Sequence, residues 1–217
     1  MNTVEALADR PPGASERPDA AAPLPGTRTA VHRRAVRRIA SAVAVLTTNT
    51  ERGPHGVTVS SLSAVSREPL LVGICLQHRS ASLALLKESR TFAVSVLAAS
   101  QTEPARRFAD PGRPRGPAQF DLVDWEPDPV SGAPLIADAL AWLSCRLTAT
   151  VTAGDHELLL AEVVEGVARD GRPLLSFGGS MASVSALEAT APPTGRTAPD
   201  PSAGPTPAPP PREGETG

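Results

Sequence analysis

The chain has 217 residues, a formal net charge of −2 and a hydrophobic fraction of 41%. A near-neutral charge argues against a protein that binds nucleic acid, and the apolar runs fall far short of the roughly 20 residues that cross a bilayer. The two cysteines, Cys75 and Cys145, are too few for a disulfide scaffold and lack the spacing of a metal-binding pair, so no metal site is predicted. Residues 1–20 carry acidic side chains and no apolar stretch, which argues against a secretory signal and favours the cytoplasm.

Proline is concentrated at both ends of the chain, which has 24 prolines in all. The stretches 1–30 and 186–217 lack apolar periodicity and cannot bury enough surface to offset the entropy of ordering them. They are predicted to be disordered tails; the C-terminal one could be a polyproline II ligand for a partner domain, although a solvated tail is the simpler interpretation. Residues 31–185 remain as one domain of a size that suits a single core.

The predicted domain begins with a short helix over 32–40, which has valine, alanine and isoleucine on one side and arginine on the other. A strand over 42–48, a turn over 49–55 and a second strand over 56–63 follow it. Residues 70–76 are continuously apolar, which predicts a strand that is covered on both faces.

Two further helices interrupt the strands. The first, over 80–90, is expected to have Ser80 as its N-cap and to turn Leu83 and Leu86 inward. The second is expected over 101–109, and the proline-rich stretch that follows is predicted to be mainly loop.

The other strand patterns lie close together along the chain. They cover 91–97, 139–152, 156–167 and 174–177. The Gly154-Asp155 pair marks a hairpin turn between the two long strands. Strands at hairpin spacing pair antiparallel, so the fold class is predicted to be mainly β, a barrel with a few short helices.

Several familiar catalytic motifs are missing from the sequence. There is no G-x-G-x-x-G and no phosphate-binding G-x-x-x-x-G-K-[ST] loop. The stretch 178–182 resembles the G-x-S-x-G turn of serine hydrolases but ends in alanine, which leaves a hydrolase at Ser180 as a weak alternative. His156-Glu157 begins like a zinc-protease motif, but Leu160 stands where the second histidine is needed.

Hydroxyl side chains are concentrated in the second strand, where residues 58–63 include one threonine and three serines. Hydroxyls suit a ligand with many hydrogen-bond acceptors, such as a phosphate or a heterocycle, and Arg106 and Arg107 supply fixed positive charges. A strand with this composition can equally be one that is half exposed to water.

Residues 31–179 resemble the flavin reductase-like, FMN-binding split-barrel proteins, which include the reductase components of two-component flavin-dependent monooxygenases. The matching segments are 56–66, Pro69 with the strand that ends in Cys75-Leu76, 79–82, 105–109, 132–135, 139–145 and 154–156. The resemblance implies a six-stranded antiparallel split barrel, usually a homodimer, that reduces FMN with NADH or NADPH. FAD and riboflavin are alternative flavins, and a flavin-dependent monooxygenase that receives reduced flavin is the implied partner.

The resemblance also implies site residues. The flavin-binding residues are Thr58, Val59, Ser60 and Ser61 on one side, Cys75, Leu76, Gln77, Ser80 and Ser82 on the other, and Arg106, Arg107 and Phe108 of the second helix. Of these, Arg106 or Arg107 is expected to pair with the FMN phosphate, and the two helix serines would lie where a helix N-terminus favours an anion. His156 is the implied catalytic residue, since it would hydrogen-bond to the nicotinamide dinucleotide.

The sequence departs from the family pattern over 173–181, where relatives often carry an aromatic residue and an arginine. The chain also has no tyrosine. A flavin-binding protein with another redox role, or a non-catalytic module that docks a partner, therefore remains an alternative to the reductase.

Overall fold

The computed structural model of the chain describes residues 27–183, and the remainder of both predicted tails lies outside the described residues. Helix α1 (Thr27–Val36) begins ahead of the predicted domain boundary at residue 31. Within 27–183, no helix is both long enough and apolar enough to span a membrane.

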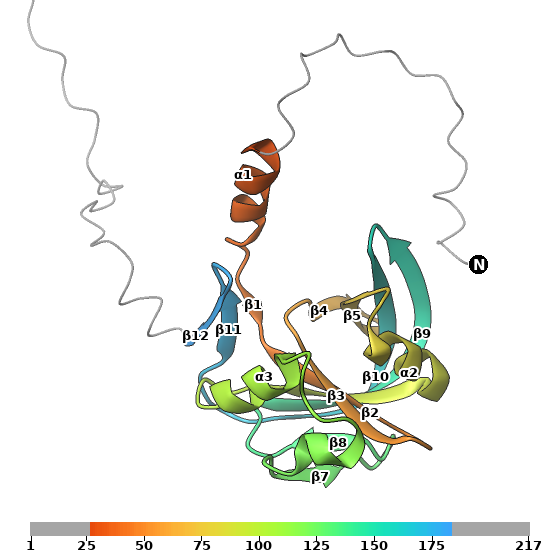
Figure 1. Cartoon of the computed structure of the whole chain (residues 1–217). Helices are drawn as coiled ribbons and strands as arrows, with labels where there is room; N and C mark the ends of the chain where they lie inside the picture. The colour runs from red at the N-terminus through yellow and green to blue at the C-terminus, as the bar shows by residue number, and fades with distance from the viewer. Residues whose placement is uncertain (1–26, 184–217) are drawn as a thin grey trace, which may run out of the picture.

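The main sheet has seven strands in the order β3-β2-β6-β9-β10-β5-β4, and every pairing in it is antiparallel (Figure 1). Its strands are β2 (Ala44–Thr50), β3 (Gly53–Val59), β4 (Ser63–Arg67), β5 (Leu70–Gln77), β6 (Thr91–Val96), β9 (Ala141–Ala153) and β10 (His156–Ala168). The mainly β, antiparallel class predicted from the sequence is confirmed.

The main sheet of the described residues has seven strands where the resemblance implied six, because it contains β4 as an edge strand. The strand expected over 56–63 ends at Val59, and Ser60–Leu62 carries the chain from one edge strand of the sheet, β3, to the other, β4. Since period-two alternation continues from one strand into the next, the sequence pattern does not reveal where the chain changes edge.

Smaller elements surround the main sheet. They are α2 (Ala81–Ser89), α3 (Thr102–Ala109), the 3₁₀ helix η2 (Gly116–Phe120), the β7 (Trp125–Pro127) and β8 (Pro134–Ile136) pair, and a sheet of β1 (Ser41–Ala42), β11 (Leu174–Phe177) and β12 (Ser180–Ser183). The sequence predicted neither η2, β7, β8 nor β12, since the first three are short and contain proline, and β12 is only four residues long. Gly178 and Gly179 form the turn between β11 and β12, where both have positive φ, so Ser180 begins a strand instead of standing on a strand-to-helix elbow.

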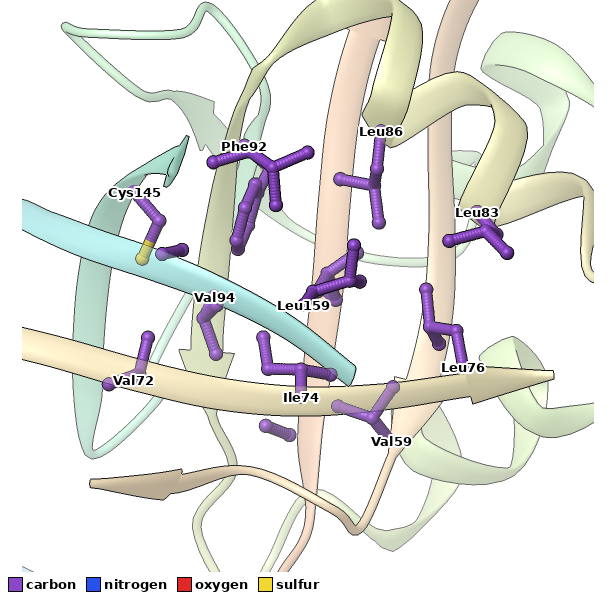
Figure 2. Packing of buried hydrophobic residues seen from close by; sticks show 14 residues of the cluster. Val59, Val72, Ile74, Leu76, Leu83, Leu86, Phe92, Val94, Cys145 and Leu159 are labelled. Atoms are coloured by element: carbon purple, nitrogen blue, oxygen red, sulfur yellow. The ribbon is translucent and has the colours of Figure 1, made fainter. Parts of the chain in front are cut away.

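The barrel interior is filled by aliphatic side chains, one phenylalanine and Cys145, which converge from several strands and α2 (Figure 2). Phe92, Ile74 and Leu159 are fully buried there. Leu83 and Leu86 of α2 point into this cluster, which confirms the inward side predicted for that helix.

Helix α1 projects away from the barrel, beside β11 and β12 (Figure 1). The apolar residues predicted to lie on one side of this helix are uncovered: Val31 and Val36, and Ile39 just after the helix ends, expose 62%, 65% and 69% of their surface. The end of the helix is attached to the β11–β12 turn, where the Gly178 N–H donates to the Arg37 carbonyl at 2.8 Å.

A side chain bridges the gap between the two edges of the sheet. Within the described residues, β4 pairs with β5 only from Leu70 to Gly73, so the last part of β5 has no strand on that side. The Ser61 hydroxyl takes the place of a strand there, because it donates to the Cys75 carbonyl and accepts from the Cys75 N–H, both at 3.0 Å. We call this contact the seam.

Replacing Ser61 with alanine should open the seam. Both polar backbone groups of Cys75 lose their partner, so we expect the free energy of unfolding to fall by about 1–3 kcal/mol, measured by urea denaturation. Ser63→Ala is the matched control, because that exposed hydroxyl donates only to the neighbouring Ala64 carbonyl. An equal loss in both variants would show that the seam adds no stability.

Candidate functional site

Two segments predicted to bind different ligands lie side by side at one end of the barrel. His156 begins β10, and its Cα partner in β5 is Gln77, the last residue of that strand. The β5–α2 turn is joined to the same place by the His78 N–H, which donates to the Asp155 carbonyl at 3.1 Å. The structure therefore brings the predicted nicotinamide residue next to the predicted flavin segment.

The His156 imidazole is oriented by its neighbour in the turn. Its Nδ1 lies 2.7 Å from Asp155 Oδ1, and a carboxylate can only accept, so Nδ1 carries the hydrogen and Nε2 is left for a ligand. The hydrogen bond from His156 is also the main reason that the pKa of the Asp155 carboxyl lies below its usual range.

The N-terminus of α2 offers hydrogen-bond donors that the protein does not use. Ser80 occupies the predicted N-cap position, but its side chain makes no cap hydrogen bond in the described structure. Arg79 is exposed, and its guanidinium has no partner among residues 27–183. The N–H groups of Ser80 and Leu83 donate to the carbonyls of Gln77 and Ser80, whereas those of Ala81 and Ser82 have no acceptor among residues 27–183. This turn therefore combines free donors with a positive charge.

A network of side chains attaches the first turn of α2 to β3. His55 Nε2 lies 2.9 Å from Ser82 Oγ, and His55 Nδ1 lies 3.3 Å from Gln119 Nε2. Gln119 is fully buried, and its Oε1 accepts from the Gly56 N–H at 3.1 Å. Burial lowers the pKa of His55 to about 4, and the positive charges of Arg113 and Arg115 add to this effect.

The arginines predicted to bind phosphate lie elsewhere, on α3. Arg107 Nε and Nη2 donate to the carbonyls of Gln119 and Ala118 at 2.6 and 2.9 Å, so this side chain holds η2 in place. Arg106 pairs with Glu103 at 2.8 Å on the exposed side of the helix. Both arginines line an open hollow of about 390 Å³ together with Arg113.

The predicted flavin-binding residues thus divide into three groups. Those at or beside the seam and the start of α2 are Ser60, Ser61, Cys75, Gln77, Ser80 and Ser82. The second group has side chains buried in the core and comprises Val59, Leu76 and Phe108. Only the backbone of these residues is left to contact a ligand. Thr58 joins the third group with Arg106 and Arg107, since its hydroxyl donates to the Ala105 carbonyl of α3 at 2.6 Å.

Sequence reasoning missed three residues that the structure places in or behind this site. Arg79 adjoins Ser80 and could have been found, because a cation beside a predicted helix N-terminus is a visible signal. His55 and Gln119 gave no such signal, since they lie in a predicted turn and a predicted loop and meet only through the fold.

The outer face of the sheet beside the seam is apolar. Cys75 alternates with the buried Ile74 and Leu76, so its side chain is on this face, where its cross-strand neighbour is Leu158 and the next one is Val151. Val151 is 41% exposed. An exposed apolar sheet face of this kind is typical of an interaction surface.

A second hollow, of about 440 Å³, lies at the opposite end of β10 from His156. Its lining includes Ser100, Asp138 and Arg169 and none of the predicted site residues. Arg169 is paired with Asp138 and lies over the Trp142 ring, so its charge already has partners within the fold.

Comparison with known proteins identifies similar chains. The family model described as flavin reductase like domain matches residues 36–185. The NADPH-flavin oxidoreductase of Streptomyces viridifaciens is 43% identical over 149 residues, which cover 68% of this chain and 77% of that protein. The reductase component of 4-nitrophenol 4-monooxygenase/4-nitrocatechol 2-monooxygenase from Rhodococcus opacus is 31% identical over 147 residues, which cover 68% of this chain and 76% of that one.

The fold also matches a solved structure. The NADH:FAD oxidoreductase of Streptomyces globisporus, in complex with NAD and FAD fragments, superimposes with a TM-score of 0.67 and 35% sequence identity. The match covers 84% of this chain and 99% of that one.

Proposed function

The chain belongs to the flavin reductase-like domain family, and from this membership we propose how its residues divide the work of the reaction. The protein is an NAD(P)H-dependent flavin reductase with a split-barrel fold, as the sequence resemblance implied. It uses NADH or NADPH and a flavin, FMN or FAD. The observation that carries the residue assignment is the set of unused donors at the start of α2, adjacent to His156.

The residues at this end of the barrel fit a flavin. A flavin nucleotide has an anionic phosphate, a hydroxylated chain and a flat ring, which need cationic donors, polar groups and an apolar surface respectively. Arg79 and Ser80 supply the first, Ser60 the second, and the outer face around Cys75 the third. When bound, the flavin supplies the ring that accepts the hydride; the protein contributes binding and orientation.

We assign the phosphate to the N-terminus of α2. No donor of Arg79 has a partner within residues 27–183, whereas two nitrogens of Arg107 are occupied by the carbonyls of η2. Arginine can bind a phosphate through two parallel hydrogen bonds, and the helix N–H groups add to the attraction. The hollow beside α3 then remains available to another part of a longer ligand, such as the remainder of FAD.

We assign the nicotinamide to His156. With Nδ1–H held by Asp155, Nε2 is the ring atom left for the ligand, and without a hydrogen it accepts from the carboxamide NH₂ group. The ring thus orients the nicotinamide and takes no electrons. Holding two rings in contact converts a bimolecular hydride transfer into a unimolecular step, which is the main contribution that this site can make.

We also infer a homodimer whose two copies pack through the apolar outer face of β5, β9 and β10. Val151 and Leu158 are adjacent on this face. Val65 packs over Gly73 on the same face, because Gly73 has no side chain; a Cβ on Gly73 would lie 3.0 Å from Val65 Cγ2.

Relatives are reductase components of two-component monooxygenases, so we propose that a monooxygenase receives the reduced flavin, in the cytoplasm where NAD(P)H is formed.

The purified protein should oxidise NADH or NADPH only when FMN or FAD is added, followed by the loss of nicotinamide absorbance. His156→Ala should raise the KM for the nicotinamide nucleotide about tenfold, which corresponds to one lost hydrogen bond of about 1.4 kcal/mol, and leave the Kd of FMN nearly unchanged. Flavin binding without turnover would contradict the reductase, and equal losses for both ligands would contradict the role of His156.

Arg79→Ala should weaken FMN relative to riboflavin by about 1.5–3 kcal/mol, because riboflavin lacks the phosphate that the guanidinium binds. The measurement is the ratio of the two dissociation constants from titration of flavin fluorescence. Arg106→Ala removes a cation from α3 instead and is the matched comparison. A change in the ratio for Arg106→Ala and none for Arg79→Ala would return the phosphate to α3.

Sedimentation equilibrium should give twice the chain mass for the protein and the single mass for Val151→Lys, since each copy would bring a charge into the apolar interface. Leu122→Lys is the control, because Leu122 is an 81% exposed apolar residue in a loop away from this face. A monomeric wild type, or a dimer that survives Val151→Lys, would contradict this interface.

A further inference from the structure

The hydrogen bonds between β3, η2 and α2 form a chain whose direction is fixed at one end. It begins at the Gly56 N–H, which can only donate and which donates to Gln119 Oε1 at 3.1 Å. That bond determines which way the Gln119 amide is turned. The amide nitrogen must therefore be the atom that faces His55.

Each later bond follows from the one before it. Gln119 Nε2 is a donor, so His55 Nδ1 must accept and carries no hydrogen. A neutral imidazole then has its hydrogen on Nε2, which donates to Ser82 Oγ at 2.9 Å. Ser82 Oγ is therefore an acceptor in this bond, and its own hydrogen is left for another acceptor.

The Ser82 hydroxyl hydrogen has no protein acceptor among residues 27–183. Ser82 is only 2% exposed, so bulk water is a poor substitute for a partner. It lies in the first turn of α2, beside the N–H groups and Ser80 that we assigned to the flavin phosphate. An anion bound at this turn would supply the acceptor that the serine lacks.

We propose that Gln119 and His55 are positioning residues that orient the Ser82 hydroxyl as a hydrogen-bond donor to the phosphate of the bound flavin. This inference rests on the proposed reductase function and deepens it. Neither positioning residue touches the ligand; they decide which way the serine hydrogen points. The phosphate of a flavin nucleotide gains a neutral donor in addition to the guanidinium of Arg79.

The surroundings keep this chain of bonds in one direction. A protonated His55 would turn an Nδ1–H toward the amide hydrogens of Gln119, and Arg113 and Arg115 would repel the charge as well. Because the pKa of His55 is lowered to about 4, the ring remains neutral above pH 5 or so, and the direction does not change over the working range of the enzyme.

The first test needs no ligand. The chain has four histidines, so single substitutions assign their imidazole signals in a nitrogen-edited NMR spectrum. We expect His55 to be the neutral tautomer with hydrogen on Nε2 from pH 5.5 to 8.5. A tautomer with hydrogen on Nδ1, or a ring that titrates near its ordinary value, would overturn the proposal.

The second test compares FMN with riboflavin by fluorescence titration. Ser82→Ala should lower the preference for FMN about tenfold, because a hydrogen bond to a charged group is lost, and should leave the preference for NADPH over NADH unchanged. Ser63→Ala is the control on a distant exposed serine. A changed NADPH preference would move the phosphate in question from the flavin to the nicotinamide nucleotide and overturn the assignment.

Gln119→Glu provides a signature that a structural role would not give. A carboxylate still accepts from the Gly56 N–H, but it forces the neutral His55 to carry its hydrogen on Nδ1, and Nε2 then accepts from Ser82 instead of donating to it. The variant should lose about tenfold in FMN preference above the pKa of His55 and regain it below, where the imidazolium donates from both nitrogens. The ratio is taken to the wild type at each pH, so that ionisation of FMN cancels.

The outcomes separate this inference from the proposed function. A wild type that binds neither flavin would remove the reductase assignment, whatever the tautomer of His55. A wild type that binds FMN, with Ser82→Ala and Gln119→Glu keeping its preference at every pH, would leave the reductase in place and overturn the orienting role. If Gln119→Glu fails to fold, Ser82→Ala and the tautomer decide between the two.

Discussion

The architecture depends on how the two edges of a single antiparallel sheet are held together where, among residues 27–183, the end of β5 pairs with β10 on one side and with no strand on the other. The seam at Ser61 provides that contact, because a serine hydroxyl can accept from an N–H and donate to a carbonyl at once. It fixes the end of β3 against Cys75, and through β5 it fixes both the start of α2 and the partner of His156. The functional end of the barrel is therefore arranged by the same hydroxyl that closes the sheet.

The hydroxyl-rich segment after Val57 has two roles: some of its side chains hold neighbouring elements in place, and others are exposed to a ligand. Composition alone predicts that threonine and serine serve a ligand or a half-exposed surface. In the structure, Thr58 holds α3 and Ser61 holds β5, whereas Ser60 is exposed at the same place. An edge strand has unpaired backbone groups along one side, and short hydroxyl side chains are well suited to pair with them. The same residues thereby build the place at which a flavin can bind.

The sequence predicted the fold class, most strands and the inward side of α2, because these depend on local periodicity. It also predicted His156 and Gln77 as site residues, but not that they face each other across β5 and β10, since strand register is a property of the whole sheet. His55 and Gln119 were not predicted as site residues for the same reason, since their contact depends on the whole fold. The sequence places the histidine in a predicted turn and the glutamine in a predicted proline-rich loop. Only the fold brings His55 Nδ1 and Gln119 Nε2 within 3.3 Å of each other.

One difference between sequence and structure carries information of its own. The continuous apolar run of β5 predicts a strand covered on both faces. The chain covers the face with Ile74 fully and the other face only in part, since Gly73 is buried there and Cys75 is partly exposed. Removing apolar side chains from water is favourable, so an apolar outer face on β5 is the pattern expected of a face that another molecule covers. A second copy of the chain would do so without any further partner, and the seam lies at its border. A flavin ring at the border of this face would contact the second copy as well, and binding of the cofactor and assembly of the dimer would then favour each other.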